Sequence, residues 1–88
     1  MPYKGLPVSI LRIQETKAQF GYPSHASVYN NVKLGLCTTG VRIGQRSVGW
    51  PSQEIAAINH ARIAGKSDDE IRQLVNRLHA KRLEPLAA

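Results

Sequence analysis

The sequence VRIGQRSVGW, residues 41–50, contains the pattern that decides the expected fold of this chain. Val41 and Ile43 alternate with a polar residue on one side of a short loop, and Val48 and Trp50 alternate with a glycine on the other. Alternation with a period of two on both sides of a loop is typical of a β-hairpin. We expect Ile43 to pair with Val48 and Val41 with Trp50, so that all four apolar side chains lie on one face.

The tip and the other face of this hairpin are polar and cationic. The loop over residues 44–47 begins with a glycine, which tolerates positive φ, and continues with side chains that form hydrogen bonds. With the expected pairing, Arg42 lies opposite Gly49, and Arg46 lies at the tip. A hairpin with one apolar face and a cationic tip indicates a wing that contacts a phosphate backbone.

Length and composition predict one small globular domain. The chain has 88 residues, of which 42% are hydrophobic, and a chain of this size buries about 60–65% of its unfolded surface. No apolar run approaches the roughly 20 residues that a membrane span needs, and the start shows no secretory pattern. The single cysteine, Cys37, cannot form an internal disulfide, which fits a reducing cytoplasm. We therefore expect a cytoplasmic protein without a membrane partner.

Basic residues are concentrated in the first part of the chain. Residues 1–66 contain eight Lys or Arg and two acids, a net charge of 8 − 2 = +6, whereas residues 67–88 contain four of each, a net charge of zero. No acidic residue lies between Glu15 and Glu54. Excess positive charge is often only a solubility device, but an acid-free window that includes the hairpin favours a nucleic-acid partner.

Two short helices are expected ahead of the hairpin. Residues 14–20 permit a helix that stops at the Gly-Tyr-Pro sequence of residues 21–23. Ser24 is a good N-cap for a second helix over residues 24–34, and Gly35 follows it in the position of a C-terminal cap. Two helices joined by such a turn describe a helix-turn-helix, in which the second helix is the candidate reader of DNA.

Residues 1–13 precede these helices. Residues 1–9 are expected to form an irregular arm that carries Lys4, because two prolines and a glycine lie among the first seven. Residues 8–13 are rich in apolar and β-branched side chains. A short strand there would add to the hairpin as a third partner.

A third helix is expected directly after the hairpin. Ser52 would cap it, and it would run to about Ala64 and close at Gly65. Its buried side chains are expected to be Ile55, Ile58 and Ile63.

The sequence SDDE at residues 67–70 is the clearest local pattern in the chain. It fits a capping box, and its three acids complement the dipole of a fourth helix over residues 68–82. The apolar stripe of this helix consists of Ile71, Leu74, Val75 and Leu78. This stripe either holds copies of the protein together or folds back on its own domain to complete a thin core.

Several motifs of residues 10–62 occur together in a known family. They are IQE at 13–15, Gly21, SHASVY at 24–29, Gly35, VRIG at 41–44, RSVGW at 46–50 and SQEI at 52–55. In these motifs the segment resembles the AlpA-like family of small phage and mobile-element regulators, which includes excisionases (recombination directionality factors). The resemblance implies an α+β fold, a small winged helix-turn-helix of the MerR-like or excisionase-like kind, with an added C-terminal helix. The expected division is an arm at 1–9, the winged helix-turn-helix at 10–65, an amphipathic helix at 66–84 and a tail at 85–88.

The resemblance also implies a function. An excisionase binds and bends double-stranded DNA near an attachment site and promotes excision of a mobile element by an integrase, which is a tyrosine or serine recombinase. The alternative is an AlpA-like transcriptional regulator, and one protein can serve both roles. A monomer with roughly four phosphate contacts has a salt slope near −3.6 and binds weakly alone, so we expect copies to bind cooperatively, either head-to-tail or as a symmetric dimer. The expected location is the bacterial cytoplasm on the nucleoid, with no cofactor, metal or small-molecule ligand.

The candidate DNA contacts come from the second helix, the wing and the first helix. Asn30 and Asn31 suit adenine, because an amide bonds N6 and N7 together, and Arg46 suits a narrow minor groove or a phosphate. Lys17 is expected to contact the DNA backbone. The candidates on the second helix are Ser24, His25, Ser27, Asn30, Asn31 and Lys33, and those on the wing are Arg42, Gln45, Arg46 and Ser47.

Several of these residues have a purely structural alternative. Asn30 and Asn31 are alternatively solvated helix surface. Arg42 alternatively stacks on the hairpin or pairs with Glu15. Trp50 is expected in the core, because its strand phase places it with the apolar residues of the hairpin.

Other function classes are disfavoured. The acid-free window leaves no carboxylate for acid–base catalysis in the central module, and no Gly-rich phosphate cradle is present, so we expect a protein that is not an enzyme. His60 and His79 form no metal-binding spacing with Cys37. An RNA-binding module would need an exposed aromatic platform, and a purely protein-binding module would leave the acid-free charge unexplained.

Overall fold

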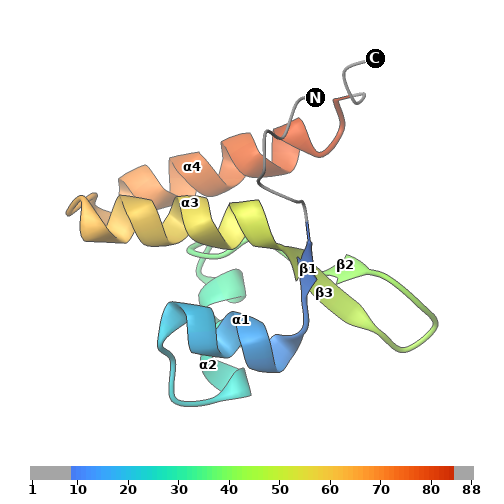
Figure 1. The fold of residues 1–88 in the computed structure, drawn as a ribbon. Coiled ribbons are helices and arrows are strands. Elements are labelled where there is room, and N and C mark those ends of the chain that lie inside the picture. Colours follow the sequence, from blue (N-terminus) through green and yellow to red (C-terminus); the bar gives the residue numbers. More distant parts are fainter. Residues whose placement is uncertain (1–8, 85–88) are drawn as a thin grey trace.

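The computed structural model describes residues 9–84, and its elements follow the order expected for an α+β chain (Figure 1). Within this range the elements are β1 (Ile10–Leu11), α1 (Ile13–Phe20), α2 (His25–Lys33), β2 (Val41–Arg42), β3 (Val48–Pro51), α3 (Ser52–Ile63) and α4 (Asp68–Lys81). The arm expected over residues 1–9 falls outside the described residues except for its last residue, and the tail at 85–88 falls outside entirely.

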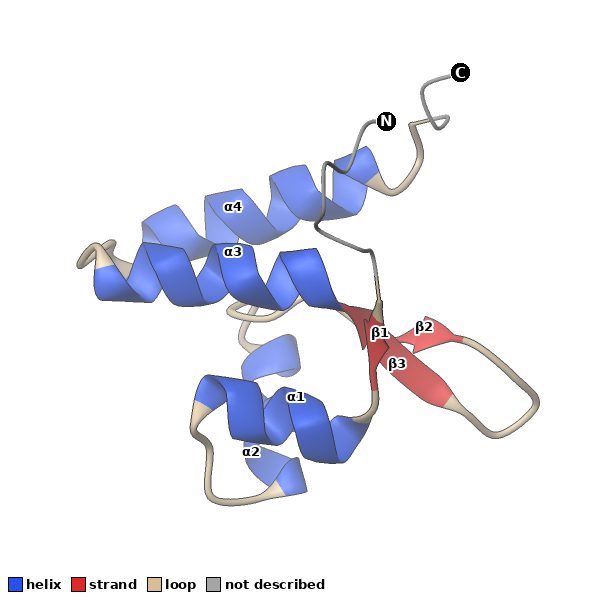
Figure 2. Cartoon of the chain, in the orientation of Figure 1, coloured by secondary structure: helices blue, strands red, loops and turns tan. Residues whose placement is uncertain are grey.

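The three strands form one antiparallel sheet in the order β1-β3-β2 (Figure 2). The third strand expected within residues 8–13 is therefore confirmed as β1. In Figure 1, α3 and α4 lie side by side above α1 and α2, and the loop between β2 and β3 projects beyond the helices.

The register of the hairpin differs by one residue from the expected pairing. Val41 lies opposite Gly49, and Arg42 lies opposite Val48. Because residues directly opposite share a face, a one-residue shift moves every side chain of one strand to the other side. The prediction that four apolar side chains share one face is therefore wrong, and so is the placement of Arg42 opposite Gly49.

Gly49 gives the physical reason for this register. A Cβ atom on Gly49 would collide with the side chain of Ile10 and lie 3.3 Å from the Cδ1 atom of Ile43. Strand β1 and the hairpin therefore pack closely only where β3 has no side chain. The backbone N–H of Ile43 donates to the carbonyl of Ser47 over 2.9 Å, so the turn spans residues 44–46.

Local capping accounts for the helix boundaries. The Ser24 Oγ accepts a hydrogen bond from the Ser27 N–H over 3.2 Å at the start of α2, and Gly35 has a positive φ of 77° after its end. At the start of α4, Ser67 and Glu70 form the expected capping box. Each of these features was predicted from neighbouring residues, because each depends on a hydrogen bond within one turn.

The start of α3 differs from the prediction. Ser52 is the first residue of α3, and Pro51 precedes the helix as its N-cap. The Ser52 Oγ instead accepts from the Ser9 N–H over 3.3 Å, while the Ser52 N–H donates to the Ser9 carbonyl over 2.8 Å. Strand β3 thus runs directly into α3, and Ser52 joins this corner to β1.

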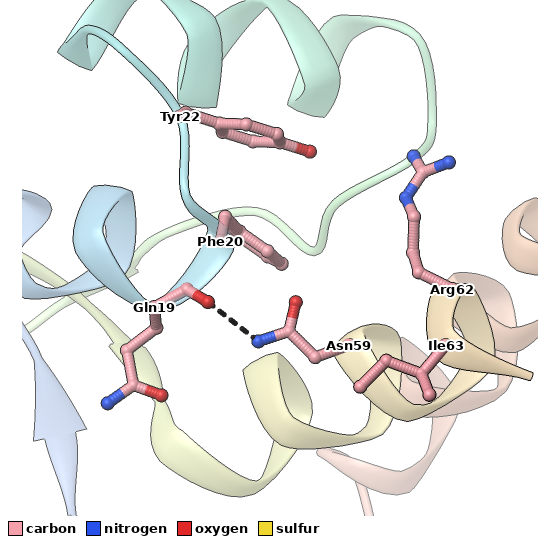
Figure 3. Close-up of a pocket in the computed structure, with 6 residues that line it drawn as sticks. All are labelled: Gln19, Phe20, Tyr22, Asn59, Arg62 and Ile63. Carbon is pink, nitrogen blue, oxygen red and sulfur yellow. Dashed lines mark hydrogen bonds between the residues drawn. The ribbon is translucent and has the colours of Figure 1, made fainter.

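A side-chain hydrogen bond links α1 to α3. The Asn59 Nδ2 donates to the Gln19 carbonyl over 2.9 Å (Figure 3).

Ile63, in the last turn of α3, is 84% exposed, so its predicted burial is wrong. It lies five residues after Ile58, a rotation of about 140° from that buried position.

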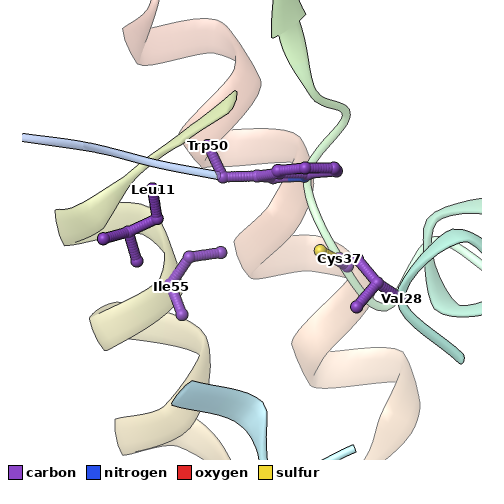
Figure 4. Packing of buried hydrophobic residues seen from close by; sticks show 5 residues of the cluster. All are labelled: Leu11, Val28, Cys37, Trp50 and Ile55. Carbon is purple, nitrogen blue, oxygen red and sulfur yellow. The ribbon is translucent and has the colours of Figure 1, made fainter. Parts of the chain in front are cut away.

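One cluster of the core surrounds Trp50, whose predicted burial is confirmed (Figure 4). Its indole Nε1 donates to the carbonyl of Thr38 over 2.8 Å. The segment between α2 and β2 is therefore part of the core rather than a simple linker. The buried members of the cluster are Leu11, Val28, Cys37, Trp50 and Ile55.

The second cluster decides between the two alternatives for the stripe of α4. Ile71 and Val75 are 0% and 2% exposed, and they pack with Ile58 of α3 and with Leu36. The stripe therefore folds back on its own domain, and these side chains are not available to hold copies together.

Candidate nucleic-acid interface

Helix α2 presents a polar surface opposite its buried side. Val28 is fully buried, and Val32 is half-buried against the core. Within α2, the predicted residues His25, Asn30 and Lys33 are exposed, and so is the N-cap Ser24. His25, Asn30 and Lys33 are therefore the predicted α2 side chains that are available to a large ligand.

The other three predicted residues of α2 are engaged locally. The Ser24 and Ser27 hydroxyls lie 3.1 Å apart, and Ser24 also caps the helix. The Asn31 Nδ2 donates to the carbonyl of Ser27 over 2.8 Å. The capping hydroxyl and the Asn31 amide therefore contribute to the helix itself.

Tyr29 is an exposed aromatic residue of α2 that is not among the predicted DNA contacts. Its ring meets Trp50 edge-on with the centroids 5.9 Å apart, yet 49% of the residue is exposed. The spacing of Ala26, Tyr29 and Lys33 at intervals of three and four places Tyr29 on the exposed stripe. This spacing is the signal that could have identified it.

The hairpin presents its predicted residues at and beside the tip. Arg42, Gln45 and Arg46 are exposed, and Ser47 is half-buried. The Arg42 Nη2 donates to the carbonyl of Gln45 over 3.4 Å, so the guanidinium contacts the hairpin rather than Glu15. Glu15 instead accepts from the backbone N–H of Arg12 over 3.1 Å.

The observed register brings Arg42 to the side of the sheet that carries α2. Arg42 shares a face with Val48, and Val48 shares that face with Trp50, two residues further along β3. Trp50 in turn contacts Tyr29 of α2. The exposed surface of α2 and Arg42 therefore belong to one side of the molecule, which the pairing expected from the sequence would not give.

Ion pairs divide the basic residues into two groups. Within residues 9–84, every salt bridge uses a cation of α3, α4 or the residues that follow them, and these pairs are Arg62–Asp68, Lys66–Glu70, Arg72–Asp69 and Arg82–Glu54. In the same range, no carboxylate lies within 4.0 Å of the basic groups of α1, its N-cap, α2 and the hairpin. These groups are Arg12, Lys17, Lys33, Arg42 and Arg46. Every described Lys and Arg of the part that contains α2 and the hairpin is thus unpaired, whereas on α3, α4 and the residues that follow them four are paired and Arg77 and Lys81 are not.

Lys17 lies in the last turn of α1 and is half-buried. Its carbonyl accepts from the backbone N–H of Tyr22 over 3.0 Å, which places it beside the turn that leads into α2. The contact of Lys17 with the DNA backbone stays a prediction.

A shallow cavity of about 330 Å³, which the sequence reasoning did not find, lies between the end of α1 and the end of α3 (Figure 3). Phe20 and Tyr22 stack at its wall with their centroids 5.0 Å apart. Burial raises the pKa of Tyr22, although the nearby Arg62 guanidinium opposes this effect. The Arg62 side chain is already bonded to Asp68 over 3.3 Å. The cavity offers apolar contact but no pair of groups suited to acid–base chemistry.

Buried or clustered reactive groups do not form a second site within residues 9–84. Burial raises the pKa of the Cys37 thiol to about 12, with Glu54 adding to the effect, so the thiol stays protonated and unreactive. In this range no three His, Cys, Asp or Glu side chains are grouped to hold a metal ion. Nor is any helix of the described chain long and apolar enough to cross a membrane.

Comparisons with protein-family models, with curated proteins and with solved structures found no match for this chain.

Proposed function

We propose that this chain is a double-stranded DNA-binding protein with a winged helix-turn-helix, in which α2 reads the major groove and the hairpin acts as the wing. The observation that carries the proposal is the shared side of α2 and Arg42, together with the absence of ion pairs on the nearby cations. A surface that keeps its cations free of carboxylates attracts phosphates.

The dimensions of α2 suit this role. An α-helix with its side chains is about 10–12 Å in diameter, which fits a major groove about 12 Å wide, and its nine residues give α2 a length of about 14 Å. Asn30 is the candidate reader of adenine, and His25 and Lys33 flank it on the exposed surface. On the wing, Arg46 enters the neighbouring minor groove or bonds a phosphate, and Arg42 contacts the DNA phosphate backbone next to Arg46.

The biological role that we propose is that of an excisionase. The AlpA-like resemblance of residues 10–62 supports this role, in which the protein bends DNA beside an attachment site and directs a tyrosine or serine integrase toward excision. Such a protein acts in the bacterial cytoplasm on the nucleoid. A transcriptional regulator with the same DNA-binding surface is the second candidate, and the resemblance supports it equally. An excision assay with purified integrase separates the two, because a regulator alone leaves the excision rate unchanged.

Cooperative binding of several copies remains part of the proposal, but its contact surface changes. Ile71 and Val75 are buried within each copy, so the contact must use other side chains. Leu34, after α2, and Ile63, at the end of α3, are 52% and 84% exposed and are among the apolar residues that remain available.

A salt titration with two matched arginine variants tests the DNA-binding proposal. Binding of a fluorescent duplex carrying the DNA beside the gene is measured between 50 and 200 mM salt for the unchanged protein, Arg46→Ala and Arg77→Ala. Arg77 is an exposed residue of α4 outside the proposed surface. We expect Arg46→Ala to weaken binding about tenfold and to reduce the salt slope by about one, while Arg77→Ala changes neither. Equal effects of the two variants, or preference for a duplex RNA competitor, would contradict the proposal.

A further inference from the structure

We propose that α4 fixes the position of the hairpin relative to α2, through polar contacts at the two ends of α4. This inference rests on the proposed function for its effect on DNA binding, but its geometry is independent of any ligand. The residues concerned are Arg72 near the start of α4, and His79 and Arg82 at its end.

At its far end, α4 holds every polar group of Thr39, a residue two positions before β2. The Thr39 N–H donates to the His79 Nε2 over 3.1 Å. The Arg82 Nη2 donates to the Thr39 carbonyl over 2.7 Å, and its Nη1 donates to the Thr39 hydroxyl over 3.2 Å. A backbone segment with its N–H, carbonyl and side chain all bonded has little freedom to rotate.

The same guanidinium also binds the segment that follows β3, the second strand of the hairpin. The Arg82 Nε and Nη2 bond the two Glu54 carboxylate oxygens over 2.7 and 2.6 Å. Glu54 lies in the first turn of α3, which begins directly after β3, and its side chain is only 6% exposed. Arg82 therefore connects the segment before β2 with the segment after β3 in a bidentate, largely desolvated pair.

Near its start, α4 holds the end of α2. The Arg72 Nε donates to the carbonyl of Leu34 over 2.8 Å, and the aliphatic part of its side chain packs over Gly35. Ten residues separate Arg72 from Arg82, a length of about 15 Å along a helix. One rigid helix thus connects the C-terminal end of the proposed reading helix with the base of the proposed wing.

Strand β3 is held by β1 and by the buried Trp50, whereas β2 pairs with β3 alone among the described strands, so the segment before β2 is the less supported base of the hairpin. Only Gly40 separates Thr39 from β2, and β2 itself has two residues. The tip lies about five residues from Thr39, or about 15 Å in an extended chain. A rotation of about 10° at the base would therefore move Arg46 by about 3 Å, as far as the length of a hydrogen bond.

A double-mutant cycle tests whether α4 acts through the hairpin. The penalty of Arg46→Ala on duplex DNA affinity is measured in the unchanged protein and in His79→Leu, which removes the acceptor for Thr39 without leaving a buried charge. His79→Gln retains an acceptor and serves as the matched control, and Arg77→Ala serves as a remote one. The cycle avoids Arg82→Ala, because removing Arg82 would leave the Glu54 carboxylate buried without its partner.

We expect the Arg46→Ala penalty to fall from about tenfold to less than about threefold in the His79→Leu background, and to stay unchanged in both controls. For two mutations at remote, independent sites, the affinity loss of the double mutant agrees with the product of the two single losses to within about twofold. Penalties that agree within twofold in all backgrounds would overturn the inference.

Amide hydrogen exchange separates this outcome from a failure of the proposed function. We expect His79→Leu to accelerate exchange at the Ile43 N–H, which bonds to Ser47 within the hairpin, by more than tenfold, and to leave the Leu34 N–H in α2 unchanged. If the unchanged protein binds no duplex DNA, the proposed function fails and the exchange result alone decides the inference. Unchanged exchange at Ile43 would overturn it.

Discussion

The part of the molecule formed by α1, α2 and the hairpin and the part formed by α3 and α4 contain similar numbers of basic residues but use them differently. On α3, α4 and the residues that follow them, most cations are paired with carboxylates, as in Arg72–Asp69 and Arg82–Glu54. On the α1–α2–hairpin part, none of the described cations is paired. On the α3–α4 part the pairs leave Arg77 and Lys81 as the unpaired described cations, so the larger share of the free positive charge lies on the α1–α2–hairpin part.

The largest expected effect tests whether the α3–α4 part is purely structural. Ile71→Ala removes a fully buried side chain between these helices and should lower the free energy of unfolding by about 2–5 kcal/mol in a urea titration. The affinity of the folded protein for duplex DNA should stay within about twofold. Gln73→Ala, an exposed neighbour, should change stability by less than about 0.5 kcal/mol. A loss of DNA affinity of more than about twofold in folded Ile71→Ala would show that the packing of α3 on α4 also affects DNA binding.

The next effect separates two neighbouring asparagines of α2. Asn30 is exposed, whereas the Asn31 amide donates to the Ser27 carbonyl. Asn30→Ala should reduce discrimination between the best and a mutated DNA site by about 1–3 kcal/mol. Asn31→Ala should leave discrimination intact. The check is a competition assay with single-base variants of the bound site. A larger loss of discrimination in Asn31→Ala than in Asn30→Ala would contradict the roles given to the two asparagines.

The smallest effect concerns the cap of α4. The backbone N–H and hydroxyl of Ser67 lower the pKa of the exposed Glu70 carboxyl below its usual 4.5. Because the folded state binds its proton less readily than the unfolded state, the contribution of Glu70 to stability is present above pH 4.5 and is lost as the pH falls through the lower folded value. Glu70→Gln should therefore flatten the fall in melting temperature below pH 4.5. An unchanged acid profile would exclude this contribution.

Features that depend on neighbouring residues were predictable from the sequence. The helices α2 and α4 have Ser24 and Ser67 as their N-caps, as expected, because an N-cap and a capping box each involve residues within one turn. The hairpin strands followed from alternation and β1 from its β-branched residues. Trp50 is buried as predicted, but Val41 and Ile43 lie on the other face of the sheet. Periodicity also gave the buried stripe of α4, and the structure then showed which of two surfaces covers it.

Features that depend on distant residues were not predictable in this way. The hairpin register follows from the close approach of Ile10 to Gly49, and the pattern of residues 41–50 alone does not indicate this contact. The bonds from Arg82 to Thr39 join residues 43 positions apart. Among the candidate DNA contacts, the sequence identified the exposed Asn30 and Arg46, but it could not show that Asn31 bonds to its own helix.

Mapping of amide chemical shifts during titration with duplex DNA tests the central claim most directly. The account predicts that the largest changes lie at residues 25–33 and 42–47, and that the outer surface of α3 and α4, including Gln73 and Arg77, changes little. Changes centred on α3 and α4, or no changes at DNA concentrations that saturate the binding assay, would contradict the claim that α2 and the hairpin form the DNA-binding surface.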